Sequence, residues 1–320
     1  MINPPIPLSP HLHLINQLKS ELNNPDGSSN FKIMRKLAQS TFPVFLIFHE
    51  PSRQYLTMKV YPYFQGKPHP RFLNESRFSN LVHKNVNPIF WSEEDAKIIS
   101  KGALKTSYIV MEYAPYETFF EAFVVNQIPF DRKLARTYFH QLIEGLEYIH
   151  SQKMAHLDLK LENLLVSDNF KLKIVDFDVS YKEGDTKIIT TGTKNYRAPE
   201  LIMKDLNNPQ AIDVYSAGIL LFIFYAGGSM PFMEEDEESM KKNNLKKLFY
   251  AEEDKFWKFQ AKILKKSDDF FENDFRDLFR HMMNEDPSQR AKISEIKNSK
   301  WYNKPIYSEE EVIEIMERYY

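Results

Sequence analysis

The chain has 320 residues, of which 42% are hydrophobic and 27% charged, a composition typical of a globular protein with a sizeable core. Its formal net charge of -2 gives no electrostatic argument for binding nucleic acid or membrane, and the absence of cysteine excludes disulfides, thiolate metal sites and a cysteine nucleophile. The N-terminal residues lack the basic start and apolar stretch of a signal peptide, and the longest apolar run, 217–228, is too short to span a bilayer. We therefore expect a cytoplasmic protein with no nucleic acid and no membrane among its partners.

The first part of the chain is expected to be an extension followed by strands. Residues 1–30 are rich in Pro, Asn and Ser and predict a poorly ordered extension, with a docking or autoinhibitory segment as the alternative. Residues 43–48 and 55–61 carry β-branched and aromatic side chains on either side of a turn, which predicts a hairpin. Residues 106–113 predict another strand, and 71–82 place apolar residues at helical spacing.

The second part is expected to be mainly helical. Residues 130–150 have an apolar stripe behind Asp131, whose side chain suits the N-cap, and 275–283 show the same period. The acidic run 233–239 predicts a solvated loop, and 308–320 predict a short amphipathic tail helix packed on the helical part. A strand-rich part followed by a helical part predicts two lobes, whose junction would suit a ligand site.

The segment HLDLKLENLL, residues 156–165, carries the residue types that phosphoryl transfer needs. That reaction requires a group to orient the attacking hydroxyl, cations to offset phosphate charge, and ligands for metal ions. Asp158 can accept or orient the hydroxyl proton, and Lys160 can neutralise charge at the transferring group. Asn163, and Asp176 in the following KIVDFD, offer the oxygen ligands that Mg²⁺ prefers.

An ordered series of motifs resembles the eukaryotic protein kinase family over residues 31–302. The series runs through TMKV, FLNESRF, VMEYA, HLDLKLENLL, DFD, TGTKNYRAPE, DVYSAGILLF and NEDPSQR. The LKLENLL and SKWYNKP segments look most like the calcium/calmodulin-kinase-like branch of the serine/threonine kinases. The resemblance implies an α+β, bilobal fold, with a small β-sheet lobe and one main helix at 31–112, a large helical lobe at 113–302, and a tail helix at 303–320.

The resemblance also implies roles for individual residues. Catalysis is expected of Asp158 and Lys160, and magnesium is expected to bind Asn163 and Asp176. The residues expected to bind ATP are Lys59, Glu75, Met111, Glu112, Ala114, Leu165 and Val44, with Phe45 as an alternative to Val44 over the adenine. The residues expected to contact the substrate are Glu117, Glu162 and Thr193, the last being similar to serine/threonine rather than tyrosine kinases. Structural roles are expected of Asp213, as a brace for the catalytic loop, and of an ion pair between Glu200 and Arg290.

Two positions in the helical and catalytic-loop motifs depart from the family pattern. Leu157 stands where most of the family has an arginine that pairs with a phosphate on the activation segment. The usual phosphosite falls near Ile189, so a contact between Leu157 and Ile189 would set the segment without phosphorylation, with the adjacent Thr190 as the alternative phosphosite. Ser79 falls one helical turn after Glu75, where a buried apolar residue is usual.

The phosphate-covering loop and the metal motif also depart from the pattern. No glycine occurs in the stretch 28–65, and Ala38, Ser40 and Pro43 take the glycine positions, which predicts a weaker hold on ATP. Asp178 replaces the glycine of DFG, and its carboxylate could either draw in a cation or weaken phosphate binding.

The retained residues favour an active ATP-dependent serine/threonine kinase, because groups that act as a unit lose activity steeply when one is missing. The alternatives are a pseudokinase that keeps the fold as a binding or scaffold module, and an unusual nucleotide or substrate. The expected partner is a protein substrate with Arg or Lys upstream of the phosphoacceptor, received by Glu162 and Glu117, unless these are ordinary surface glutamates. Nothing in the residues predicts an oligomeric state.

Overall fold

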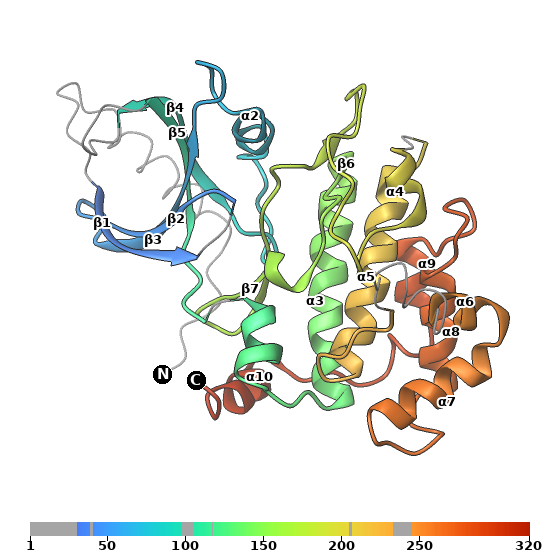
Figure 1. Cartoon of the computed structure of the whole chain (residues 1–320). Coiled ribbons are helices and arrows are strands. Elements are labelled where there is room, and N and C mark those ends of the chain that lie inside the picture. The colour runs from blue at the N-terminus through green and yellow to red at the C-terminus, as the bar shows by residue number, and fades with distance from the viewer. Residues whose placement is uncertain (1–30, 39–40, 98–104, 117, 205–206, 233–244) are drawn as a thin grey trace. The chain divides into compact units, whose positions relative to one another are not determined.

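The computed structural model describes residues 31–38, 41–97, 105–116, 118–204, 207–232 and 245–320. These residues form two compact units (Figure 1). The first comprises the described residues up to Ala114 together with Asp176–Asp178, and the second comprises Pro115–Val175 and Val179–Tyr320. The expected extension at 1–30 and the expected loop at 233–239 lie outside the described residues, and the bounds of the expected lobes stay a prediction.

The first unit contains a five-stranded antiparallel sheet in the order β1-β2-β3-β5-β4 (Figure 1). Its strands are β1 (Phe31–Ala38), β2 (Val44–His49), β3 (Gln54–Pro62), β4 (Ile89–Lys97) and β5 (Lys105–Glu112). The predicted hairpin is confirmed as β2 and β3, and the predicted later strand as β5. The sequence did not delimit β1 and β4, because register shifts in both strands break the alternation of buried and exposed side chains.

The two faces of this sheet carry different side chains. On β3, Met58 packs in one apolar cluster and Tyr61 in another, as expected for side chains that alternate between faces. Val44 pairs directly with Lys59 across β2 and β3, so these two side chains share a face. Phe45 pairs with Met58 and packs against the Met58 cluster. Val44, not Phe45, therefore lies on the Lys59 face of the sheet.

Helix α2 (Pro70–Ser76) begins where two N-terminal signals coincide. Pro70 occupies the first turn, where a missing backbone N–H costs no hydrogen bond, and the His69 side chain accepts the Arg71 backbone N–H at 3.1 Å. The prediction of helix as far as 82 is wrong in length. The chain tightens after Ser76, because the next backbone N–H groups bond three residues or fewer back rather than four.

The early end of α2 changes which side chain is buried beyond it. Ser79 lies where a full helical turn after Glu75 would place a core residue, but the backbone has already left the helix. Phe78 is buried instead, and its ring centroid lies 5.7 Å from that of Phe177. The apparent loss of an apolar residue at 79 is thus compensated one position earlier.

The second unit is mainly helical. Its helices are α3 (Arg132–Ser151), α4 (Pro199–Met203), α5 (Pro209–Tyr225), α6 (Leu245–Ala251), α7 (Glu253–Ile263), α8 (Asn273–Met282), α9 (Ile293–Asn298) and α10 (Glu309–Met316), with short helical turns η1 (Glu121–Val125) and η2 (Leu161–Asn163). Two small antiparallel sheets accompany them, one of β6 (Met154–Ala155) with β9 (Tyr181–Lys182) and one of β7 (Leu164–Val166) with β8 (Leu172–Ile174). The predicted helix at 130–150 is confirmed as α3, with the Asp131 carboxylate accepting the Leu134 backbone N–H at 2.7 Å.

Helix α5 forms the centre of this unit. All residues from Ala211 to Tyr225 are buried, so most of the longest apolar run of the sequence lies in a core helix. Around Phe222 the core is aromatic, with the rings of Trp257, Phe271 and Phe279 within 6.3 Å of its centroid. Among the described residues, no helix combines the length and apolar character needed to cross a membrane.

The C-terminal segment packs on the second unit. Helix α10 buries Val312 and Met316, as the amphipathic pattern predicted. The chain leading to α10 runs beside α3, where the Arg136 guanidinium donates to the Pro305 carbonyl at 2.8 Å and the Tyr307 hydroxyl donates to the Asp131 carboxylate at 2.7 Å.

Candidate active site

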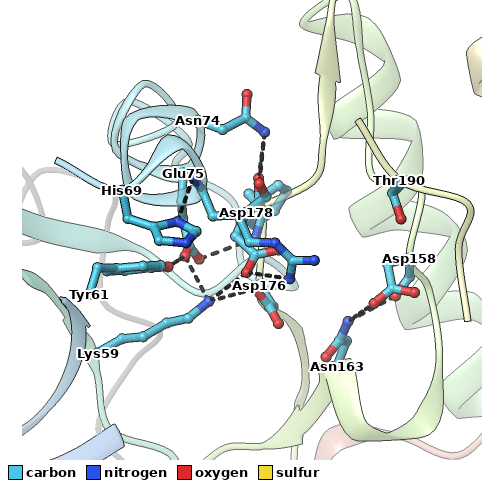
Figure 2. Close-up of polar contacts among 12 residues, drawn as sticks. Lys59, Tyr61, His69, Asn74, Glu75, Asp158, Asn163, Asp176, Asp178 and Thr190 are labelled. Atoms are coloured by element: carbon cyan, nitrogen blue, oxygen red, sulfur yellow. Dashed lines mark hydrogen bonds and ion pairs between the residues drawn. The ribbon is translucent and has the colours of Figure 1, made fainter. Parts of the chain in front are cut away.

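In the first unit, Lys59 lies among three carboxylates. Its ammonium Nζ is 2.9 Å from Glu75 Oε2 and 2.6 Å from Asp176 Oδ1, and Figure 2 shows the three side chains pointing toward one another. Tyr61, two residues along β3, donates its hydroxyl to the same Glu75 oxygen. Burial disfavours the charge on Lys59, but Asp176 and then Glu75 outweigh it, so the pKa of this ammonium is held well above its usual value. Lys59 is therefore a fixed positive charge.

The third carboxylate belongs to Asp178, which the sequence placed where a glycine is usual. Its Oδ2 lies 3.4 Å from Arg71 Nη1 and 3.6 Å from Lys59 Nζ, and only 6% of the side chain is exposed. Burial and the nearby Asp176 raise the pKa of this carboxyl, against the opposing effects of Lys59 and Arg71. Asp176 has a left-handed backbone (φ 70°) but Asp178 does not, so the Cβ at 178 adds no backbone strain. The sequence left open whether Asp178 would draw in a cation or weaken phosphate binding. In the structure its carboxylate contacts two cationic side chains of the chain itself, Lys59 and Arg71.

The other residues expected at ATP in this unit lie on β5 and just after it. Met111 and Ala114 are buried, and the Glu112 carbonyl accepts the Asn87 side-chain amide at 3.2 Å. Met111 belongs to the same cluster as Tyr61, and therefore lies on the face of the sheet that carries Lys59. Leu165, also expected at ATP, lies on β7 of the second unit.

In the second unit, Asp158 is the centre of a hydrogen-bonded network. Its carboxylate accepts from Lys160 Nζ at 2.7 Å and from the Thr193 hydroxyl at 2.6 Å, and Lys160 also lies 3.0 Å from Thr193 Oγ1. The Asn163 amide nitrogen donates to the Asp158 carbonyl at 2.8 Å and to its carboxylate at 3.3 Å (Figure 2). The four residues come from the loop before η2, from η2 itself and from the segment before α4. The sequence predicted these residues but not their mutual bonds.

Asp213 on α5 binds the backbone of the loop that carries Asp158. This fully buried carboxylate accepts the backbone N–H groups of His156 and Leu157, both at 2.8 Å, and the His150 imidazole at 2.9 Å. Leu157 has a left-handed backbone (φ 66°), which costs about 1–2 kcal/mol for a residue with a Cβ. Asp213 offsets that cost by satisfying two buried donors at once. These hydrogen bonds connect α5 to the backbone of the loop that carries Asp158.

Leu157 itself is a core residue. Its side chain is 2% exposed, whereas Ile189 is 42% exposed and Ile188 is buried. The sequence analysis expected Ile189 to turn inward and contact Leu157. The buried residue is instead its neighbour Ile188. The Thr190 hydroxyl accepts the Gly192 backbone N–H at 2.9 Å, which gives that threonine a local role in the turn.

Replacing Leu157 by Arg is expected to destabilise the protein rather than restore a phosphate-binding arginine. A guanidinium would place a full charge at this buried site, so the free energy of unfolding should fall by about 3 kcal/mol or more. Thermal denaturation of Leu157→Arg beside the apolar control Leu157→Met would measure this. Equal melting temperatures for Leu157→Arg and the wild type would show that position 157 has access to solvent.

Glu200 and Arg290 form a bidentate ion pair in the second unit. Arg290 Nη2 lies 3.1 Å from Glu200 Oε2, and Nη1 contacts the other carboxylate oxygen. The same guanidinium donates to the carbonyls of Ala211 at 2.8 Å and Asn284 at 2.9 Å, so the charge is fully enclosed by acceptors. The pair joins the start of α4 to the turn before α9.

The expected substrate residues have different placements. Glu162 is exposed on η2, where it could meet a solvent-borne partner, and Thr193 bonds Asp158. Glu117 lies outside the described residues.

Asn163 in the second unit and Asp176 in the first each keep an oxygen atom of the kind that Mg²⁺ prefers. Asn163 uses its amide nitrogen toward Asp158, which leaves the amide oxygen as its ligand atom, and Asp176 offers a carboxylate that is about one-third exposed. In the described ranges no cluster of three or more His, Asp or Glu side chains is arranged to hold a metal alone. Mg²⁺ usually takes one or two protein ligands and completes its shell with water and substrate phosphate oxygens.

Several residues around Lys59 were not predicted. They are Phe42, Tyr61, Arg71 and Asn74. A signal for part of this set was available, because Arg71, Asn74, Glu75 and Phe78 recur at helical spacing on one face of the segment at α2.

This combination of sheet, helices and site defines a protein kinase domain. The family model described as "Protein kinase domain" matches residues 40–302, and the chain belongs to this family. The α+β fold and the serine/threonine type of the resemblance are confirmed.

Individual relatives agree with this assignment. The chain is 35% identical over 208 residues to CBL-interacting protein kinase 11 of Oryza sativa subsp. japonica, covering 62% of this chain and 37% of the relative. It is 34% identical over 200 residues to CBL-interacting serine/threonine-protein kinase 8 of Arabidopsis thaliana, covering 62% and 41%. It is 34% identical over 197 residues to SNF1-like protein kinase ssp2 of Schizosaccharomyces pombe, covering 61% and 31%. The chain thus spans well under half the length of these relatives.

Proposed function

We propose that the chain is an ATP-dependent protein serine/threonine kinase that transfers the γ-phosphoryl of Mg-ATP to a protein hydroxyl. The observation that carries this proposal is the network of Asp158, Lys160, Asn163 and Thr193. A fold kept only as a scaffold has no need of a carboxylate bonded by a lysine, an amide and a hydroxyl, because these contacts stabilise little at a partly exposed site.

Each residue of the network has a role in the proposed reaction. Asp158 orients the attacking serine or threonine hydroxyl and accepts its proton, and it already accepts a hydroxyl hydrogen from Thr193 at 2.6 Å. Lys160 offsets negative charge on the transferring phosphoryl group. Asn163 and Asp176 would hold Mg²⁺, which neutralises charge on the ATP phosphates when it is bound. Lys59, kept charged and oriented by Glu75, binds the ATP phosphates.

The remaining residues support binding and specificity in this proposal. The adenine end of ATP is contacted by five residues, namely Val44, Met111, Glu112, Ala114 and Leu165. The exposed Glu162, with Glu117, receives a basic residue upstream of the phosphoacceptor. We extend the proposal to a kinase domain at 31–302 acting on a protein substrate in the cytoplasm.

A pseudokinase is the second candidate, and the placement of Phe42 favours it. Phe42 precedes β2 in the loop that lacks glycine, and its side chain is 5% exposed. Its ring centroid lies 4.5 Å from that of Tyr61 and 5.8 Å from Lys59 Nζ, on the face of the sheet that carries Lys59. An aromatic ring packed there competes for space with phosphates that approach Lys59.

Labelled Mg-ATP with the purified chain and a mixed Ser/Thr peptide pool tests the two candidates. The kinase proposal expects label on peptide or on the chain itself, whereas a pseudokinase shows none. Phe42→Ala should lower the Kd for Mg-ATP, by roughly tenfold if the ring must move for phosphates to bind. Transfer absent from both wild type and Phe42→Ala, with Mg-ATP bound in each, would favour the pseudokinase.

A further inference from the structure

One face of the segment at α2 contacts Phe177 and Asp178, the two residues that follow Asp176, within the first unit. Glu75 Oε1 accepts the Phe177 backbone N–H at 3.1 Å, and the Phe78 ring packs against the Phe177 ring. The Asn74 amide donates to the carbonyls of Phe177 at 3.3 Å and Asp178 at 3.1 Å (Figure 2). The metal motif is therefore attached to α2 through its backbone as well as its side chains.

Arg71 balances the charge that Asp178 adds. Lys59 alone would face the carboxylates of Glu75, Asp176 and Asp178, and the extra carboxylate would compete for its ammonium. The Arg71 guanidinium lies 3.4 Å from Asp178 Oδ2, on the helix that also carries Glu75. Arg71 and Asp178 thus form a pair of their own, and Lys59 keeps its shorter contacts with the other two carboxylates.

We propose that Arg71, Asn74 and Asp178 are positioning residues that together clamp Asp176 beside Lys59 without a phosphate on the activation segment. This inference rests on the proposed kinase function for its kinetic consequences. Leu157 provides no cation for such a phosphate, and we infer that order at Asp176–Asp178 comes from another contact. Asp178, which stands in place of the usual glycine, supplies this contact with two residues of α2. Arg71 pairs with its carboxylate, and Asn74 donates to its carbonyl.

The clamp predicts different kinetic effects for its two charged members. Among the described residues, Arg71→Gln leaves Lys59 as the cation within 4 Å of the buried Asp178 carboxylate, so KM for Mg-ATP should rise by about tenfold. Asp178→Gly removes the ion pair with Arg71 and also removes the carboxylate that competes for Lys59. We therefore expect kcat to fall by about tenfold with little change in KM. In the double variant Arg71→Gln/Asp178→Gly, KM should return to the Asp178→Gly value. Arg53→Gln, an exposed arginine in the turn between β2 and β3, is the matched control.

Hydrogen exchange tests the clamp independently of catalysis. The Phe177 amide, which donates to Glu75, should exchange at least about fivefold faster in Asn74→Ala and Asp178→Gly, while amides in β3 keep their wild-type rates. This arm stands even if the wild type transfers no phosphate, which would contradict only the proposed function. Exchange at Phe177 within about twofold of wild type in both variants would overturn the clamp. A double variant whose KM stays as high as that of Arg71→Gln would overturn the charge balance between Arg71 and Asp178.

Discussion

Replacing Asp158 by Asn is expected to lower kcat for phosphoryl transfer by roughly 10²–10⁴-fold, the range that a positioned general base contributes. The amide retains the size of the carboxylate but cannot accept the hydroxyl proton. It also places an NH₂ group where either Lys160 or Thr193 now donates, so it reorganises the network that positions the phosphoryl group. The initial rate of transfer from labelled Mg-ATP, with wild type and variant at equal concentration, measures the effect.

The binding of Mg-ATP and the fold should survive this change. Asp158 is partly exposed and its ion pair with Lys160 is solvent-accessible, so the melting temperature should move little. Asp168→Asn is the matched control, because Asp168 is an exposed carboxylate shortly after the same loop. Equal initial rates of transfer by Asp158→Asn and wild type would show that Asp158 takes no part in the reaction. The kinase proposal would then lose its main support.

Much of the fold was predictable because local signals and tertiary packing agree. Asp131 caps α3 as its side chain and the following apolar stripe predict, and the alternation in β2 and β3 matches the two faces of the sheet. The ordered series of kinase-like motifs also assigned residues far apart in sequence, such as Lys59, Glu75 and Asp176, to one site. These three side chains are in contact in the structure. Patterns of that kind carry tertiary information that single segments lack.

The rest depends on contacts that no local pattern specifies. The length of α2 was overestimated because the apolar period continues past Ser76, although the backbone tightens there. The direction of the Asp178 side chain follows from Arg71, a residue more than 100 positions away, whose pairing cannot be inferred from spacing. The inward residue near the activation segment is Ile188 rather than Ile189, because a count along an irregular segment gives no side-chain direction.

Replacing Arg290 by Met is expected to lower the free energy of unfolding by about 3–5 kcal/mol, the cost of leaving a buried charge without its partner. Glu200 would remain buried with its carboxylate unpaired, and the carbonyls of Ala211 and Asn284 would lose a donor. For a protein of this size the melting temperature should fall by roughly 10 °C. Urea denaturation and calorimetry of the purified variants measure both quantities.

The double variant separates the cost of the unpaired charge from the value of the pair. Glu200→Leu/Arg290→Met removes both charges, so it should regain a large part of the loss, but not all, because the two carbonyls remain without a donor. Lys297→Met is the control, since Lys297 pairs with Glu147 at 2.7 Å where both side chains are more than one-third exposed, and it should cost less than about 1 kcal/mol. A double variant no more stable than Arg290→Met would locate the loss in the carbonyl contacts. The stabilising part of Arg290 would then be its bridge between α5 and the turn before α9, and not its charge opposite Glu200.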